Sequence, residues 1–101
     1  MFTPEQLNEA LQICMEFGPE RGIPAEQRVS RRFAALTSQE VAEIVALHDR
    51  VINRATTLGG QVIEGKLGFN QAVTALESEF PALDAEVLGR AVNQGCWFAA
   101  K

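Results

Sequence analysis

His48 is the only histidine in this chain of 101 residues, and histidine is the side chain that most readily exchanges a proton near neutral pH. At about 100° per residue it falls in the middle of an apolar helical arc, with Val45 and Ile52 about one turn away on either side. Ala55 and Gly59 continue the same side, and such small residues let another backbone approach closely or leave a pocket. Two interpretations follow: a neutral core histidine that donates one hydrogen bond, or a pocket in which these five residues bind a small ligand.

Metal binding and catalysis are not favoured around His48. Zinc normally takes several nitrogen or sulfur ligands, and no histidine or cysteine stands three or four positions away. Asp49 is the next residue, so on a helix its side chain diverges from that of His48 by about 100°. The sequence contains no nucleophile motif, phosphate-binding loop or CxxCH haem attachment. We therefore expect no catalytic residue, no metal site and no cofactor; an enzyme that uses His48 as an acid or base is a minor alternative.

Arg28, Arg31 and Arg32 share one side of a predicted helix at spacings i, i+3 and i+4. The ordinary interpretation is a solvated face that pairs with Glu20, Glu26 or carboxylates of another helix. The alternative is a docking patch for an acidic partner or a phosphate.

The aromatic pair Trp97–Phe98 near the carboxyl end has two possible roles. Core packing is the favoured one, and anchoring of a protein interface is the alternative. Cys14 and Cys96 lie far apart without a CxxC motif, which favours two buried thiols in a reducing cytosol over a disulfide.

The composition is that of one globular domain over residues 1–101, with 47% hydrophobic and 22% charged residues. A formal net charge of −4 argues against nucleic-acid and anionic-membrane partners, since both attract positive charge. No secretory signal is visible, and no apolar stretch approaches the roughly 18 residues that a membrane span needs. These features predict a cytoplasmic protein.

Four or five helices and no strand are expected from the apolar periodicity. Capping boxes at Thr3–Gln6 and Thr37–Glu40 predict two helix starts, and Asp84 is a candidate cap for the last helix. The expected ranges are Pro4 to Gly18–Pro19, about Pro24 to Ala35, about 38–64, about Asn70 to Glu79, and Asp84 to about Gly95. Three short apolar ridges are expected to be buried: Val29, Phe33 and Leu36; Phe69, Val73, Leu76 and Phe80; and Val87, Leu88, Ala91 and Val92.

The helix over 38–64 is the most informative prediction. Its apolar residues keep helical phase through Gly59-Gly60, and a break there would reset that phase. We therefore expect one helix of about 26 residues, roughly 40 Å long. The predicted fold is all-α, a compact four- to five-helix bundle around this central helix.

Self-association is favoured because shorter helices cannot cover the whole apolar arc of the long one. Charge is also segregated, since residues 70–89 carry acidic but no basic side chains. The sequence thus predicts a non-catalytic cytoplasmic protein of bacterial type that binds another protein, most simply as a homodimer. The alternative is a small-ligand or cofactor-binding bundle with its pocket at His48.

Overall fold

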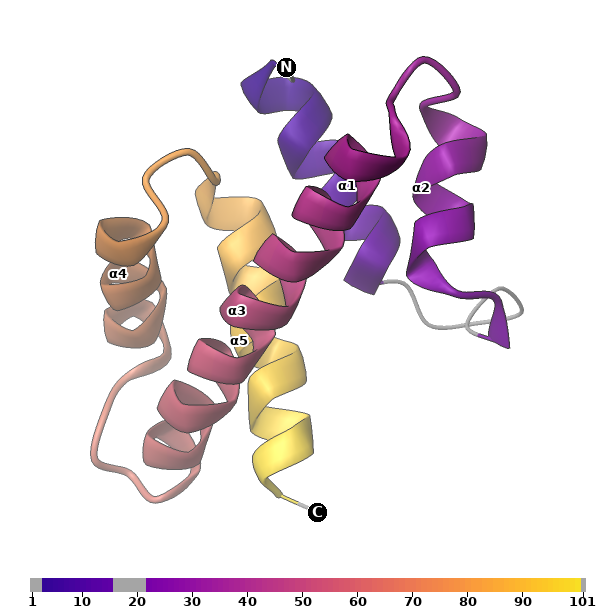
Figure 1. The fold of residues 1–101 in the computed structure, drawn as a ribbon. Helices are drawn as coiled ribbons and strands as arrows, with labels where there is room; N and C mark the ends of the chain where they lie inside the picture. Colours follow the sequence, from indigo (N-terminus) through magenta and orange to yellow (C-terminus); the bar gives the residue numbers. More distant parts are fainter. Residues whose placement is uncertain (1–2, 16–21, 101) are drawn as a thin grey trace. The chain divides into compact units, whose positions relative to one another are not determined.

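The computed structural model describes residues 3–15 and 22–100, which form five α-helices and no strand (Figure 1). The helices are α1 (Pro4–Met15), α2 (Ala25–Arg32), α3 (Ser38–Ile63), α4 (Phe69–Glu79) and α5 (Ala85–Ala99). The residues group into two compact units, Met1–His48 and Asp49–Lys101, and α3 contributes its first part to one and its second part to the other. The predicted all-α class is confirmed.

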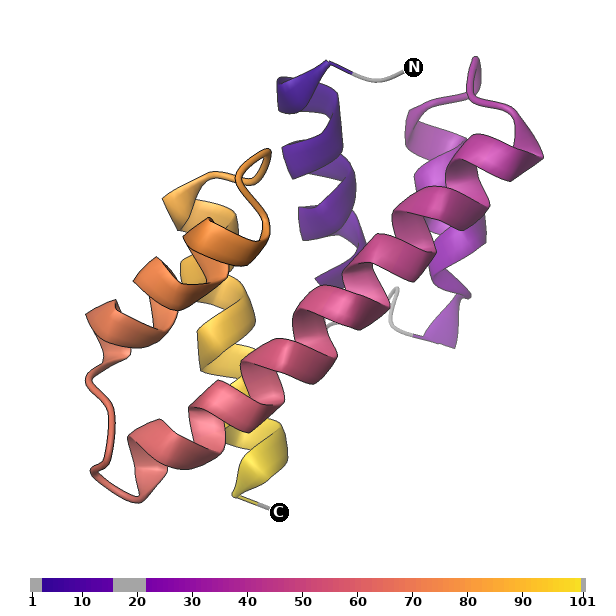
Figure 2. The same ribbon diagram turned by 60° about the vertical axis from the view of Figure 1, so that its left-hand side comes forward.

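Helix α3 is 26 residues long and runs without a break through Gly59 and Gly60 (Figure 2). The predicted long helix is therefore confirmed. Its start is fixed by the expected capping box: the Thr37 hydroxyl accepts from the Glu40 N–H at 3.1 Å, and the Glu40 carboxylate accepts from the Thr37 N–H at 2.9 Å. The same reciprocal pair joins Thr3 and Gln6 at the start of α1.

The end of α3 is a Schellman motif centred on Gly65. The Lys66 N–H donates to the Gln61 carbonyl at 2.9 Å, and the Gly65 N–H donates to the Val62 carbonyl at 3.1 Å. Gly65 has φ of 76°, the left-handed conformation that glycine adopts without a steric penalty. This residue, and not Gly59 or Gly60, stops the helix.

In the first unit, α1 and α2 pack against each other through an apolar interface. Val29 of α2 is fully buried, whereas Phe33 and Leu36 of the predicted ridge are only half-buried. The buried side chains of this unit are Ala10, Leu11, Cys14, Met15, Val29, Val41 and Ile44.

In the second unit, α4 packs against α5 and runs opposite to it, while α5 runs in the same direction as the second part of α3 (Figures 1 and 2). The Asp84 carboxylate caps α5 by accepting from the Val87 N–H at 2.9 Å, as predicted. The buried side chains are Val51, Ala55, Leu58, Ala72, Leu76, Leu83, Val87, Leu88, Ala91 and Val92.

Helices α3 and α5 meet backbone to backbone. A Cβ added at Gly59 would lie 2.5 Å from the Cys96 nitrogen, and one added at Gly95 would collide with the Ala55 carbonyl. Gly60 is different, because a Cβ there would reach only the Ala99 Cβ at an ordinary 3.8 Å. Two glycines, one on each helix, therefore set how closely the helices approach.

The predicted helix ends differ from the structure at two places. α2 ends at Arg32 and not near Ala35, because Phe33 leaves helical geometry with φ −126° and ψ 69°, and a turn leads into the Thr37 cap. α5 continues past Gly95 to Ala99. Gly95 is a contact residue and not a helix stop. The predicted end of α1 at Gly18–Pro19 lies outside the described residues.

Several apolar side chains are more exposed than expected. Phe69 was expected in the core but is 37% exposed, and Val73 and Phe80 are half-buried. Phe69 is the first residue of α4, so no helical turn before it covers the ring. Ile63 is 52% exposed because it is the last residue of α3, so no helical turn after it covers its side chain.

Substitution of the adjacent glycines tests the α3–α5 contact. Gly59→Ala is expected to lower the free energy of unfolding by about 2 kcal/mol or more, because backbone must move to admit the methyl group. Gly60→Ala is the matched control and is expected to raise it by up to about 1 kcal/mol through helix propensity. Urea denaturation followed by circular dichroism measures both. Equal effects of the two variants would contradict the described contact.

Candidate functional site

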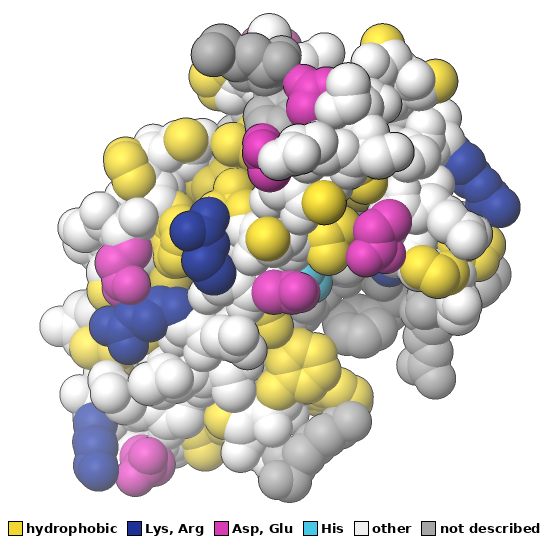
Figure 3. All heavy atoms as spheres, in the orientation of Figure 1, with side chains coloured by type: hydrophobic (Ala, Val, Ile, Leu, Met, Phe, Trp, Pro, Cys, Tyr) yellow, Lys and Arg dark blue, Asp and Glu magenta, His cyan; other side chains and the backbone are white. Residues whose placement is uncertain are grey.

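The five predicted ligand-binding residues lie along α3, but their surroundings differ. His48, Val45 and Ile52 are half-buried, whereas Ala55 and Gly59 are buried. A small part of the histidine side chain, drawn in cyan, reaches the surface in Figure 3. None of the described polar or charged residues is fully buried, and both interpretations of His48 stay predictions. A partly wet imidazole avoids the free-energy penalty of complete desolvation.

The space beside Ala55 and Gly59 is occupied by α5. Gly95 lies against the Ala55 carbonyl, and the Cys96 backbone lies against Gly59. Of the two roles expected for these small residues, close backbone approach is the one that the structure shows. Binding of a small ligand beside His48, Val45 and Ile52 stays a prediction.

Cys14 and Cys96 do not form a disulfide with each other. Cys14 is buried, but Cys96 is only half-buried. The backbone of Cys96, and not its side chain, lies closest to Gly59. Within residues 3–15 and 22–100, no three histidine, cysteine, aspartate or glutamate side chains lie together as metal ligands would.

Arg28 differs from the other two arginines of the predicted patch. Its Nη1 donates to the Ile13 carbonyl of α1 at 2.7 Å, and its Nε donates to the Ile23 carbonyl before α2 at 3.1 Å. One half-buried guanidinium therefore links two backbone segments on either side of residues 16–21. The N–H groups of that charged guanidinium donate hydrogen bonds to two carbonyl oxygens that would otherwise have to bind water.

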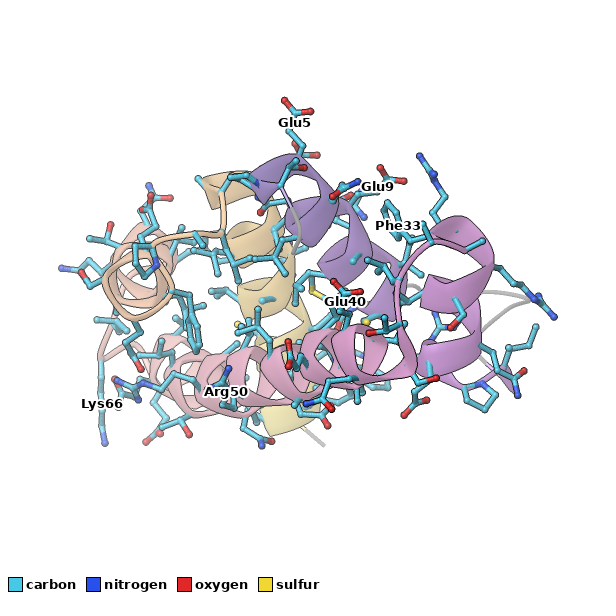
Figure 4. All side chains as sticks on the ribbon, turned by 45° about the horizontal axis from the view of Figure 1, so that its top comes forward. Glu5, Glu9, Phe33, Glu40, Arg50 and Lys66 are labelled. Atoms are coloured by element: carbon cyan, nitrogen blue, oxygen red, sulfur yellow. The ribbon has the colours of Figure 1, made fainter. Side chains whose placement is uncertain are left out.

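Arg32 pairs with a carboxylate of another helix, one of the partners expected for this face. Its Nε lies 2.6 Å from a Glu9 carboxylate oxygen, and its guanidinium stacks 4.9 Å from the Phe33 ring centroid. Figure 4 shows the labelled Glu9 and Phe33 on the same side of this unit. Arg31 is exposed. Docking of an acidic partner at Arg28, Arg31 and Arg32 remains a prediction.

Trp97 is not a core residue, contrary to the favoured prediction, because 52% of its surface is exposed. Phe98 is half-buried and meets the indole edge to face, with ring centroids 5.3 Å apart. On α5 the buried residues occupy one arc, and Trp97 lies on the opposite side of the helix. The helical phase of Trp97 could have given this result had the helix been extended past Gly95.

Replacement of arginines distinguishes the structural from the surface role. Arg28→Met is expected to lower the free energy of unfolding by about 1–2 kcal/mol, because charged hydrogen bonds to two carbonyls are lost. Arg32→Met is the control and is expected to lower it by less than about 1 kcal/mol, as for an exposed ion pair. Denaturant midpoints at low and high salt measure the difference. An Arg28 variant as stable as the Arg32 variant would refute the linking role.

Comparison with known proteins adds no relative to this description. No family model matches the chain, and no similar curated protein or solved structure was found. No helix among the described residues has both the length and the apolar character needed to cross a membrane. The function is therefore argued from the residues and the geometry alone.

Proposed function

We propose that the chain is a non-catalytic, cytoplasmic protein-binding domain that works by self-association, as a homodimer. The observation that carries this proposal is the exposure of large apolar side chains in the second unit: Trp97 and Ile63 are each 52% exposed and Phe69 is 37% exposed. Full burial of such a side chain contributes about 1.5–3 kcal/mol, so a partner that covers these residues gains free energy.

Trp97 is the most informative of the three residues. Single exposed aliphatic residues are common on soluble proteins and need no explanation. Tryptophan is enriched at the energetic centres of protein interfaces, because its large ring buries much area with few rotatable bonds. Ile63 and Phe69 lie at helix ends, whereas Trp97 lies within α5 on a regular helical surface.

The free cysteines are compatible with the proposed compartment. Cys14 and Cys96 form no disulfide, and thiols persist in a reducing cytosol. This feature supports the cytoplasmic part of the proposal and has no bearing on the partner.

The charge of the chain gives a way to recognise a second copy as the partner. Two copies that each carry −4 repel one another, and added salt screens that repulsion. A basic partner would be attracted at low salt and released at high salt. The salt dependence therefore has opposite signs for the two kinds of partner.

Sedimentation equilibrium tests the proposal directly. We expect a mass that rises from that of the 11.0 kDa chain toward twice that value with increasing concentration. We also expect the dimer to tighten a few-fold between about 0.05 M and about 0.5 M NaCl, because screening weakens the like-charge repulsion. A single monomeric species at all concentrations up to the millimolar range would rule self-association out.

A further inference from the structure

The outer surface of α5 carries a ridge formed by Gly89, Asn93 and Trp97. These residues are spaced four apart, and residues at this spacing form one continuous ridge on a helix. Asn93 and Trp97 are exposed and Gly89 is half-buried. The ridge faces away from the arc of α5 that contacts α3 and α4.

Gly89 has no role inside the chain that would require glycine. It lies within α5, where glycine is disfavoured relative to alanine, and its φ is not positive. A Cβ added there would find no atom within 4 Å, whereas one added at Gly95 of the same helix would collide with Ala55. Gly89 therefore leaves a gap on the surface of α5 that no described atom of its own chain fills.

We propose that α5 pairs with α5 of a second copy, antiparallel, about a twofold axis at Asn93. Gly89 and Trp97 are each four residues from Asn93, in opposite directions. In this arrangement the indole of Trp97 in either copy lies in the gap at Gly89 of the other. The inference rests on the proposed self-association and names its surface.

A second copy fits this surface better than an unrelated protein, because the ridge is complementary to itself. A twofold interface requires each side chain to meet its complement at the mirrored position. The ridge provides a large residue and a gap at equal distances from its centre. At the centre, the Asn93 amide carries both donors and acceptors, so it can pair with an identical amide.

The charges of α5 agree with the same partner. The helix carries one acidic residue, Glu86, and one basic residue, Arg90, so it is neutral in a chain of net charge −4. Both are exposed and lie four residues apart. Arg90 adjoins Gly89, so the antiparallel arrangement brings its guanidinium beside the partner's indole, where a cation is attracted to the ring. Antiparallel helices also align their dipoles favourably.

The contact of one helix pair is small. Stable interfaces bury about 1,200–2,000 Å² in total, and a single pair of 15-residue helices provides less. We therefore expect a dissociation constant in the range of about 10–100 µM.

Two variants and one control test the pairing in the full chain. Trp97→Ala and Gly89→Gln are each expected to raise the dissociation constant by about tenfold or more, the first by removing the ring and the second by filling the gap. Ser78→Gln, on the exposed surface of α4, is expected to leave it unchanged. Gly89→Gln should melt at or above the wild-type temperature in dilute solution, since its side chain meets no atom of its own chain.

Asn93→Cys places a thiol on the proposed axis. With oxidised glutathione present as the oxidant, this variant is expected to form a disulfide-linked dimer faster than wild type or Ser78→Cys. Equal rates for the three proteins would overturn the twofold at Asn93.

The outcomes separate this inference from the proposed function. A wild-type dimer whose dissociation constant is insensitive to Trp97→Ala and Gly89→Gln would overturn the α5 pairing and leave self-association standing. A wild-type chain that stays monomeric would overturn both. A dimer weakened about tenfold or more in both variants, with Gly89→Gln melting no lower than wild type in dilute solution, would support the pairing.

Discussion

The second unit depends on the contact between the α3 and α5 backbones at Gly59 and Gly95. Neither residue has a side chain at the contact, so the helices approach until main-chain atoms meet. Such an approach maximises dispersion contacts between the two backbones and leaves no room for any other residue type at either position. The contact explains why glycine is retained inside both helices despite a helix-propensity penalty of about 1 kcal/mol at each position.

The length of α3 and the starts of the capped helices could be predicted, because they depend on residues that are close together in the sequence. The apolar periodicity of α3 gave its length, and the capping residues Thr3, Thr37 and Asp84 gave three helix starts. Each cap involves atoms within three residues of one another. Element type and start therefore followed from the sequence without knowledge of the packing.

Features that depend on tertiary contacts could not be predicted with the same success. Gly95 looked like a helix stop, because glycine commonly follows a helix end; only the position of α3 shows that it is a contact residue. The hydrogen bonds of Arg28 to two distant carbonyls likewise have no sequence signal beyond the arginine itself. For the candidate site, the apolar phase of α3 placed Ala55 and Gly59 on a buried face, but the sequence could not show that α5 lies against them.

Four glycines of the second unit occupy three different environments, and comparing them shows what is unusual about the surface of α5. Gly65 supplies a left-handed turn, and Gly59 and Gly95 supply close approach. Gly89 does neither, although it lies in the same helix as Gly95. The contact at Gly95 lies two residues before Trp97, so the indole projects from a part of α5 that is packed against α3. A rigid aromatic side chain loses little conformational entropy on association, which favours binding even by a small surface.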